Sequence, residues 1–463
     1  MKSYHLWGFA LLFIVLNSLK LENSSLYLDE AYSLFYAQQD FTGLSAIFAR
    51  EANPPLYFVT LFGWVHLFGA NVFSGRMLSL LFSAILLLVL GGWISKRFGV
   101  MSSVVFCLLY ISSPTVINMS MEIRTFSLTA LLIALAVLWF INFWENKNAL
   151  TFFAFTGLSL LALYSHLNAI FPIALLGIIQ LFTEVKGIYK FGYVLILGTG
   201  VLPLLLILTE TKLSSTTQWL AIPNWSTVQT EFFLLASNWQ YVLLIIVTCC
   251  TVPFVVQWKE VQHKFTWKVF FTVAIGSWLA SFLVSQFIPV FLAKYLYFTI
   301  VFFLTIIAIL IPFLTRNLSQ LNKAIIIFVI ALTYSSGMFS TPLKPEDWKG
   351  AVNYISKIKT DDHMVIVSPG YMYRPFSYYY DYPIFSSGKD PVRELYPKGI
   401  VFLKQIAEEL FEHINPKKVI YISSHQQISD PNWNNVQLLN ERYMYLSDTS
   451  FNGIQVFRFE ERN

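Results

Sequence analysis

The chain has 463 residues, of which 56% are hydrophobic and only 12% are charged. Soluble domains carry about twice that share of charged residues, so the composition excludes an ordinary soluble protein. The net charge of +5 is small and comes largely from Lys and Arg in short loops. Basic residues in such loops set the orientation of a membrane protein, and they do not form the basic surface that binds a nucleic acid. The three cysteines fall within apolar runs, so neither a disulfide nor a cysteine metal site is predicted.

Apolar segments long enough to cross a bilayer recur through the first 340 residues, and they predict a mainly α-helical transmembrane bundle of about eleven spans. The first segment follows Lys2 and lacks a small-residue cleavage site, so we expect an uncleaved helix rather than a signal peptide. The predicted spans are residues 5–20, 72–95, 100–117, 125–144, 149–166, 167–183, 191–209, 238–257, 269–288, 295–314 and 322–339.

The basic residues between these spans predict the orientation of the bundle. When the N-terminus is placed in the cytoplasm, the basic loops all fall on the cytoplasmic side, as the positive-inside rule requires. The odd number of spans then places the C-terminus outside, so we expect a multi-pass protein of the inner (plasma) membrane. The basic residues concerned are Lys96, Arg97, Lys147, Lys186, Lys190, Lys259, Lys264, Lys268, Arg316 and Lys323.

Four regions are expected outside the membrane: two shorter loops at 118–124 and 210–237, and two longer regions. The first outer loop, residues 21–71, contains a short apolar segment, 54–69, that opens with two prolines, so we expect an interfacial helix there. After residue 340 the composition changes, and residues 341–463 predict a small α/β domain on the periplasmic or extracytoplasmic side. Its strands are expected at 364–368, 419–423 and 454–459, with a helix at 406–414.

The first outer loop holds two groups of polar residues. Asp29 and Glu30 stand just beyond the first helix, in LYLDEAYSLFYA, where carboxylates either cap the helix that follows or act in proton transfer. Glu51 and Asn53 lie immediately before a diproline, which stiffens the turn that carries them, although a surface turn has the same appearance.

Three further groups lie at predicted outer ends of spans. Glu122 and Arg124 stand at the mouth of span 125–144, and arginine is well suited to bind a phosphate with two parallel hydrogen bonds, although a solvated ion pair also explains them. His166 ends span 149–166, and Lys294 and Tyr295 begin span 295–314, where ordinary interfacial placement is the alternative. With the predicted orientation, all of these groups face the same side of the membrane. Together they predict one site that combines acids, cations and an apolar flank.

The order of the motifs LDEAY, NPPLYF, SGRMLSLLFSAILLLVL, EIRTFSL and LYSH resembles the GT-C superfamily of membrane glycosyltransferases, in particular the bacterial branch related to protein O-mannosyltransferases and the lipid A aminoarabinose transferase. The resemblance covers roughly residues 1–300 and is most specific in the first loop. It implies a hexosyl or pentosyl transferase that moves a sugar from a polyprenyl-phosphate-linked donor to the hydroxyl of a lipid, glycan or protein acceptor outside the cytoplasm, with inversion.

The resemblance also implies roles for individual residues. Asp29 matches the general base, supported by Glu30, and Arg124 and Lys294 match the cations that stabilise the departing phosphate. Glu122 is expected to orient Arg124 or to assist the acceptor or a metal, and Asp29, Glu122 and His166 are the candidate ligands if a divalent metal binds. His166, Glu51, Asn53 and Tyr295 are assigned to support or substrate binding, without a defined role.

The sequence departs from the family pattern at two of these positions. Asn53 stands where members commonly have His or Lys, and Lys294 stands where Arg is usual, which retains the charge but loses the planar guanidinium. Two other functions stay open. A lipid or polysaccharide transporter would carry ionisable or helix-breaking residues near the bilayer midplane, and a non-catalytic assembly protein would tolerate loss of Asp29.

Overall fold

The structure is a computed structural model that describes residues 4–48, 54–210, 220–257, 263–339, 344–408, 410–411, 414 and 416–462. The chain divides into two units. The first, called here the helical unit, contains Met1–Leu21, Ser45–Thr60 and Arg76–Pro342. The second, the sheet unit, contains Glu22–Leu44, Leu61–Gly75 and Leu343–Asn463, so it combines part of the first loop with the C-terminal segment. The predicted division at 340/341 falls on residues 340–343, which lie outside the described chain.

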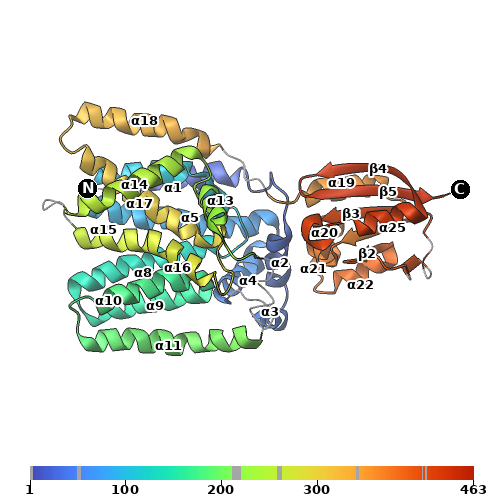
Figure 1. The fold of residues 1–463 in the computed structure, drawn as a ribbon, viewed down its shortest axis with the longest axis horizontal. Helices are drawn as coiled ribbons and strands as arrows, with labels where there is room; N and C mark the ends of the chain where they lie inside the picture. Colours follow the sequence, from blue (N-terminus) through green and yellow to red (C-terminus); the bar gives the residue numbers. More distant parts are fainter. Residues whose placement is uncertain are drawn as a thin grey trace. The chain divides into compact units, whose positions relative to one another are not determined.

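Apolar helices joined by short connections build the helical unit (Figure 1). Helices α3 (Phe41–Phe48), α4 (Leu56–Phe68) and α5 (Val72–Phe98) contribute residues to both units. The other helices of the unit are α1 (Tyr4–Ser18), α6 (Val100–Ser112), α7 (Pro114–Ser120), α8 (Phe126–Asn146), α9 (Ala149–Ser165), η1 (Leu167–Ala169), α10 (Ile170–Leu181), α11 (Gly187–Glu210), α13 (Trp225–Ala236), α14 (Trp239–Gln257), α15 (Lys264–Phe271), the π-turn η2 (Thr272–Gly276), α16 (Ser277–Val284), η3 (Ala293–Leu296), α17 (Tyr297–Leu314) and α18 (Gln320–Met338).

The predicted mainly helical membrane fold is confirmed, but the predicted eleven spans are not. Among the described residues, six helices are long and apolar enough to cross a membrane, or up to eight if each of two bent pairs forms one span. The bent pairs are α6 with α7, at 65°, and α13 with α14, at 109°. Each predicted segment overlaps a helix, but α1 and α9 have only 15 and 17 residues. Hydropathy therefore located these helices, and the predicted start of α9 at residue 149 agrees with its N-cap at Asn148, whose side chain accepts a hydrogen bond from the Thr151 backbone N–H.

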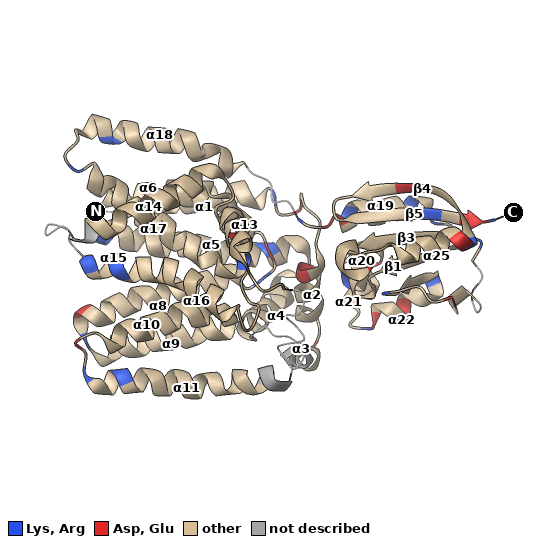
Figure 2. Cartoon of the chain, viewed as in Figure 1, with Lys and Arg blue, Asp and Glu red and all other residues tan. Residues whose placement is uncertain are grey.

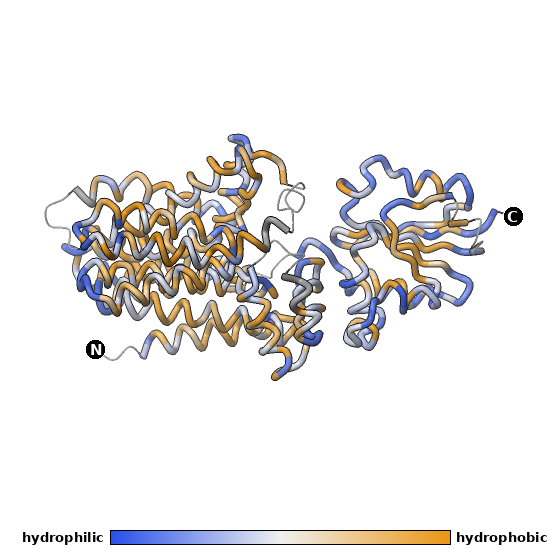
Figure 3. The backbone as a smooth tube through the Cα atoms, turned by 90° about the horizontal axis from the view of Figure 1, so that it is seen from below, coloured by the Kyte–Doolittle hydropathy of each residue, from blue (hydrophilic) through white to orange (hydrophobic). Residues whose placement is uncertain are grey.

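Charged side chains lie at the ends of the bundle helices. Figure 2 shows basic residues near the beginning of α11 and on the short helix α15, which is the first part of the candidate span Lys264–Val284 and carries Lys264 and Lys268. Figure 3 shows long hydrophobic stretches along the helices of this unit, with hydrophilic residues near their ends. Few of the described apolar side chains of α11 and none of those of α18 are buried, which is the surface that a lipid-facing helix presents. The chain is therefore an integral, multi-pass membrane protein.

A five-stranded mixed sheet forms the centre of the sheet unit, with the strand order β2-β1-β3-β5-β4. β1 pairs in parallel with both β2 and β3, and β5 pairs antiparallel with β3 and β4. The predicted strands at 364–368, 419–423 and 454–459 are confirmed, and two further strands, β2 and β4, complete the sheet. The bounds are β1 (His363–Ser368), β2 (Ile400–Phe402), β3 (Lys418–Ser424), β4 (Tyr443–Phe451) and β5 (Ile454–Glu461).

Helices cover both faces of this sheet. One core joins Val365 and Ile420 to α19 (Trp348–Ile358) and α20 (Tyr373–Tyr380), and the other joins Ile366 and Val419 to α25 (Asn434–Arg442). Successive side chains of β1 and β3 point to opposite faces of the sheet, so each strand contributes residues to both cores. Both faces of these strands are covered, because nearly all of their residues are buried. The remaining elements are short: α2 (Leu28–Ala37), η4 (Gly370–Met372), α21 (Tyr382–Ser386), α22 (Pro391–Leu395), η5 (Tyr396–Lys398) and α24 (Gln426–Ser429). The helix predicted at 406–414 includes residues 409, 412 and 413, which lie outside the described chain.

Candidate active site

Hydroxyl groups fasten the beginning of α8 to the end of α9. The Thr125 hydroxyl donates to the Ser165 carbonyl oxygen at 2.7 Å and lies 2.9 Å from the Ser165 hydroxyl, which in turn lies 2.7 Å from the Thr129 hydroxyl. Such hydrogen bonds between small polar side chains hold helices together where apolar burial alone gives little specificity. They fix Arg124, which precedes this cluster, close to His166, which follows it.

Arg124 lies in the tight turn between α7 and α8. Its backbone N–H donates to the Glu122 carbonyl oxygen at 2.7 Å, and the Ser79 hydroxyl of α5 donates to the same oxygen at 2.6 Å. The turn is therefore anchored to α5 through the backbone of Glu122. The Arg124 side chain is buried, with 8% of its surface exposed. A permanently charged guanidinium buried at a helix beginning is costly unless anionic or polar groups surround it, so the position is a candidate for an anionic ligand.

His166 separates α9 from η1 and is also buried. The backbone N–H of Asn168 donates to its Nδ1 at 3.1 Å, so a neutral imidazole at this position carries its proton on Nε2. The Asn168 side chain also donates to the Val290 carbonyl oxygen at 3.2 Å, which ties the His166 turn to the segment before α17. The centre of its ring lies 5.0 Å from that of Tyr295 and 5.9 Å from that of Phe126, and both neighbouring rings are tilted against it.

Lys294 and Tyr295 belong to η3, directly before α17. The Lys294 ammonium lies 5.7 Å from the centre of the Tyr295 ring, and the charges of Lys294 and Arg124 both act on His166. The structure thus brings together Arg124, His166 and Lys294, here called the cationic cluster. Two cations and one imidazole N–H form a set of hydrogen-bond donors, which suits an anion such as a phosphate.

Glu231 is a polar residue at this place that the sequence did not single out. It lies on α13, and its carboxylate accepts a hydrogen bond from the Ala293 backbone N–H at 2.5 Å. The carboxylate also interacts with the charge of Lys294. The sequence offers no reason to select Glu231, because it is a single acidic residue in the predicted loop 210–237 and belongs to no recognisable motif. Only its contact with η3 identifies it as a group that positions Lys294.

Arg76 was likewise missed, although a sequence signal existed. It stands within the apolar run SGRMLSLL, where an ionisable residue is unusual, and its side chain is fully buried. Its Nη1 donates to the Leu21 carbonyl oxygen at 2.5 Å, so it links the end of the first helical segment to α5. We assign Arg76 to the architecture of the helical unit.

The other acidic candidates, Asp29 and Glu30, lie on α2 of the sheet unit. Glu30 is fully buried and its carboxylate lies 3.6 Å from the ammonium of Lys344, which is also buried. Asp29 is partly exposed. Neighbouring residues on a helix project about 100° apart, so the two carboxylates occupy different environments.

Further contacts fasten α2 to the C-terminal part of the sheet unit. The guanidinium of Arg374 lies 4.6 Å from the ring centre of Tyr32 and 5.2 Å from that of Tyr36, and it donates to the Tyr36 hydroxyl at 3.0 Å. The Tyr379 hydroxyl accepts a hydrogen bond from the Leu26 backbone at 2.7 Å. The segment that carries Asp29 is therefore an integral part of the sheet unit.

Glu51 and Asn53 fall within residues 49–53, outside the described chain. No three His, Cys, Asp or Glu side chains come close enough together to hold one metal ion in the part of the chain that the structure describes. The acidic candidates Asp29 and Glu30 belong to the sheet unit, whereas Glu122 and the cationic cluster belong to the helical unit.

Known proteins were compared with this chain by sequence and by structure. No protein-family model matches it, and no curated protein sequence matches it. ArnT from Cupriavidus metallidurans, in a crystal structure of the apo state, aligns over 99% of this chain and 98% of its own length, with a TM-score of 0.57 and 14% identity. The same protein bound to undecaprenyl phosphate aligns with a TM-score of 0.57 and 13% identity, again over 99% and 98% of the two chains.

The Archaeoglobus fulgidus oligosaccharyltransferase, in a crystal structure with Zn and sulfate, aligns over 98% of this chain and 73% of its own length. Its TM-score is 0.52 and its identity 10%. ArnT and this oligosaccharyltransferase are both members of the GT-C superfamily. This chain therefore has the GT-C fold. The predicted resemblance is thereby confirmed at the level of the fold, over nearly the whole chain rather than the first 300 residues alone.

Proposed function

We propose that this protein is a membrane glycosyltransferase that moves a sugar from a polyprenyl-phosphate-linked donor to an acceptor hydroxyl on the extracytoplasmic side of the membrane. The observation that supports the proposal is the cationic cluster, in which Arg124 and Lys294 lie near His166 at the ends of apolar helices in a GT-C fold. A neighbour of the same fold has been crystallised with undecaprenyl phosphate, a lipid of the polyprenyl-phosphate class proposed here as the carrier of the sugar.

The cluster matches the charge that the reaction creates. The sugar of the donor is linked through a phosphodiester of charge −1, and breaking the bond between the anomeric carbon and the phosphate oxygen leaves a phosphate monoester of charge close to −2. Arg124 and Lys294 neutralise the added charge, and the Nε2–H of His166 donates a hydrogen bond to it. Donors that are fixed before the reaction stabilise a transition state without reorganisation.

Asp29 is the proposed general base. The acceptor oxygen attacks the anomeric carbon from the side opposite the phosphate, its proton passes to the Asp29 carboxylate, and the bonding electrons leave with the phosphate, so the configuration inverts. Asp29 is the partly exposed member of its pair, whereas Glu30 is buried against Lys344. Glu30 then supports Asp29 indirectly, by anchoring α2.

Cells provide the first test. A strain that lacks the gene and one that carries Asp29→Asn are expected to lose the same glycosyl modification of an envelope lipid, glycan or protein, observed by mass spectrometry. Glu22→Gln, which changes an exposed acid of the same loop, is the matched control and retains the modification. Because one well-placed base contributes about a hundred- to ten-thousandfold in rate, a full modification in the Asp29→Asn strain would exclude Asp29 as the base.

Purified protein tests the phosphate site separately. In lipid nanodiscs, release of polyprenyl phosphate from polyprenyl-phosphate-linked sugars is expected to fall by roughly two to three orders of magnitude in Arg124→Ala and in Lys294→Ala. Lys186→Ala, which removes an exposed cation, leaves the rate unchanged. Normal donor turnover in both cluster variants would remove the phosphate assignment.

The same assay separates the transferase from a transporter. A transporter carries the donor across the bilayer without breaking a covalent bond, so it moves a labelled donor between leaflets and leaves its mass unchanged. The transferase predicts free polyprenyl phosphate and a glycosylated acceptor in equal amounts.

A further inference from the structure

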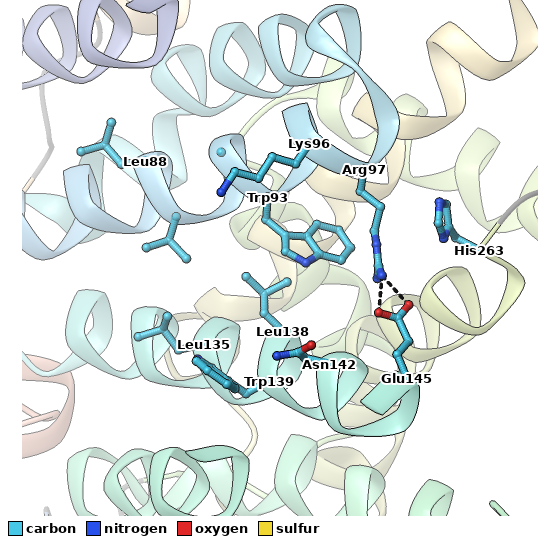
Figure 4. A pocket seen from close by; sticks show the side chains of 12 residues that line it. Leu88, Trp93, Lys96, Arg97, Leu135, Leu138, Trp139, Asn142, Glu145 and His263 are labelled. Carbon is cyan, nitrogen blue, oxygen red and sulfur yellow. Dashed lines mark hydrogen bonds and ion pairs between the residues drawn. The ribbon is translucent and has the colours of Figure 1, made fainter. Parts of the chain in front are cut away.

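A cavity of about 680 Å³ lies between α5 and α8, away from the cationic cluster (Figure 4). One wall is formed by Leu88, Trp93 and Lys96 of α5, and the other by Leu135, Trp139 and Asn142 of α8. Leu88 and Leu135 are half-buried, so the cavity is an open groove at the surface of the helical unit rather than a closed void. It is apolar along the leucines and polar where Lys96 and Asn142 lie.

The groove belongs to the other end of the bundle. Arg124 directly precedes α8, and Asn142 and Glu145 lie in its last turns. A helix of 21 residues is about 30 Å long, which is the thickness of the hydrocarbon core of a bilayer. The polar end of the groove and the cationic cluster therefore lie at opposite membrane interfaces. The groove is separate from the proposed phosphate site of the transferase, and the inference below does not depend on that function.

The dimensions of the groove fit one leaflet. Leu88 and Lys96 are eight residues apart on α5, and Leu135 and Glu145 are ten residues apart on α8, which corresponds to about 12 and 15 Å along the helices. One leaflet contributes about half of the 30 Å hydrocarbon core. An acyl chain that enters beside the leucines thus has room to lie along the groove while its headgroup reaches Lys96.

The charged residues that line the polar end of the groove sum to one positive charge. Arg97 donates to both carboxylate oxygens of Glu145 and lies 5.2 Å from the Trp93 ring, so these two charges neutralise each other. Lys96 makes no ion pair within the described residues. His263 also lines the groove; burial and the nearby charge of Arg97 lower its pKa, so it adds no charge at neutral pH.

The uncharged polar groups at this end are oriented as donors. The side-chain oxygen of Asn142 accepts a hydrogen bond from Asn146 at 2.6 Å, which leaves its amide NH2 to donate. Trp93 and Trp139 each carry an indole N–H, and Trp is typical of the level at which lipid headgroups meet the hydrocarbon. The groove thus combines one net positive charge and several hydrogen-bond donors with an apolar surface. It is complementary to a lipid whose headgroup bears one net negative charge.

We propose that the groove between α5 and α8 binds one anionic glycerophospholipid of the leaflet opposite the proposed reaction site. Its phosphate contacts Lys96 and the Asn142 amide, and one acyl chain lies along Leu88 and Leu135. Basic pockets between transmembrane helices bind anionic headgroups in this way. A zwitterionic lipid fits less well, because its ammonium group would lie close to Lys96.

Native mass spectrometry of the full-length protein tests the proposal. The protein is delipidated in detergent and titrated with phosphatidylglycerol or with phosphatidylcholine. The wild type is expected to retain one phosphatidylglycerol in preference to phosphatidylcholine, and Lys96→Gln is expected to weaken that retention about fivefold, the effect of one lysine facing an anionic headgroup. Lys147→Gln is the matched control, because this lysine lies at the same end of α8, above the Trp144 ring and outside the groove.

A second variant distinguishes a lipid from a free phosphate ester. Leu135→Trp fills the apolar part of the groove and leaves every charge in place, so it is expected to abolish the retained lipid. Glycerophosphoglycerol, which is phosphatidylglycerol without its acyl chains and keeps the phosphodiester with its single negative charge, is expected not to displace phosphatidylglycerol. Equal retention of the two lipids by the wild type, equal retention by Lys96→Gln and Lys147→Gln, or unchanged retention by Leu135→Trp would each overturn the proposal.

Discussion

The ion pair between Glu30 and Lys344 is expected to decide whether α2 stays attached to the sheet unit. Both side chains are almost fully buried, with 0% and 4% exposed, and the charged atoms lie 3.6 Å apart. Glu30→Gln leaves the Lys344 ammonium buried without its counter-charge. Removing one partner of a buried pair typically costs about 3–5 kcal/mol. Since each 1.4 kcal/mol is a factor of ten, local opening of α2 should become about a hundredfold to several thousandfold more frequent.

Hydrogen–deuterium exchange measures that opening directly. Peptides covering residues 26–37 and 344–358 should exchange faster by this factor in Glu30→Gln, while peptides from β3 stay protected. The matched control is Glu394→Gln, which removes the partner of Lys389 in a pair with a separation of 3.8 Å but with 67% and 41% of the two side chains exposed. An exposed pair contributes less than about 1 kcal/mol, so its loss should change little.

A double variant tests whether the burial of charge is the cause. Glu30→Met combined with Lys344→Met removes both charges and should recover most of the protection, because apolar groups of similar size often replace a buried pair without loss. If Glu30→Gln exchanged no faster than Glu394→Gln, or if the double variant were no more protected than Glu30→Gln, the reasoning from the buried pair would be wrong.

Three further substitutions have defined outcomes. Glu231→Gln should lower kcat/KM for the donor about tenfold in steady-state assays. The reason is that the hydrogen bond from the Ala293 backbone N–H, which positions the Lys294 segment, loses its charged acceptor. An unchanged or higher kcat/KM would contradict this role. Thr125→Val should lower the free energy of unfolding by about 0.6–1.7 kcal/mol in thermal denaturation, whereas Thr199→Val, whose hydroxyl bonds only within its own helix, should not. Arg76→Met leaves a buried carbonyl without this donor and should cost about 1–3 kcal/mol in the same measurement, so a stability equal to the wild type would contradict the assignment.

The sequence predicted the helices better than the way they cross the membrane. Apolar runs are long and continuous, and each predicted segment overlaps a helix. Where a helix breaks depends on single residues whose effect is local, such as Ser113, which caps α7 and separates it from α6 inside the predicted span 100–117. Hydropathy averaged over a window does not detect such a cap. The bend of 109° falls where the span 238–257 was predicted to begin, but α13 before it lies between predicted spans and was not predicted as a helix.

For the candidate site, the sequence predicted residues that lie close to a helix end with a recognisable motif. Arg124, His166 and Lys294 were predicted on this basis, and the structure brings them together. Glu231 was not, because its importance comes from a hydrogen bond to the backbone of η3, which is 62 residues away in the chain. Contacts of this kind depend on the packing of α13 against η3, and no local pattern of residues predicts them.

The structure also changes how the two adjacent acids of the first loop are understood. In the sequence, the adjacent residues Asp29 and Glu30 look like one pair of carboxylates with a shared role. On α2 they point in directions about 100° apart, so burying one leaves the other on the flank of the helix. Lys344 and the aromatic contacts of Arg374 hold the buried side of α2 against residues that follow the last membrane helix. A C-terminal sheet unit that looks peripheral in the sequence therefore holds the segment with the proposed base, so residues that follow the last membrane helix have a physical role in the proposed site.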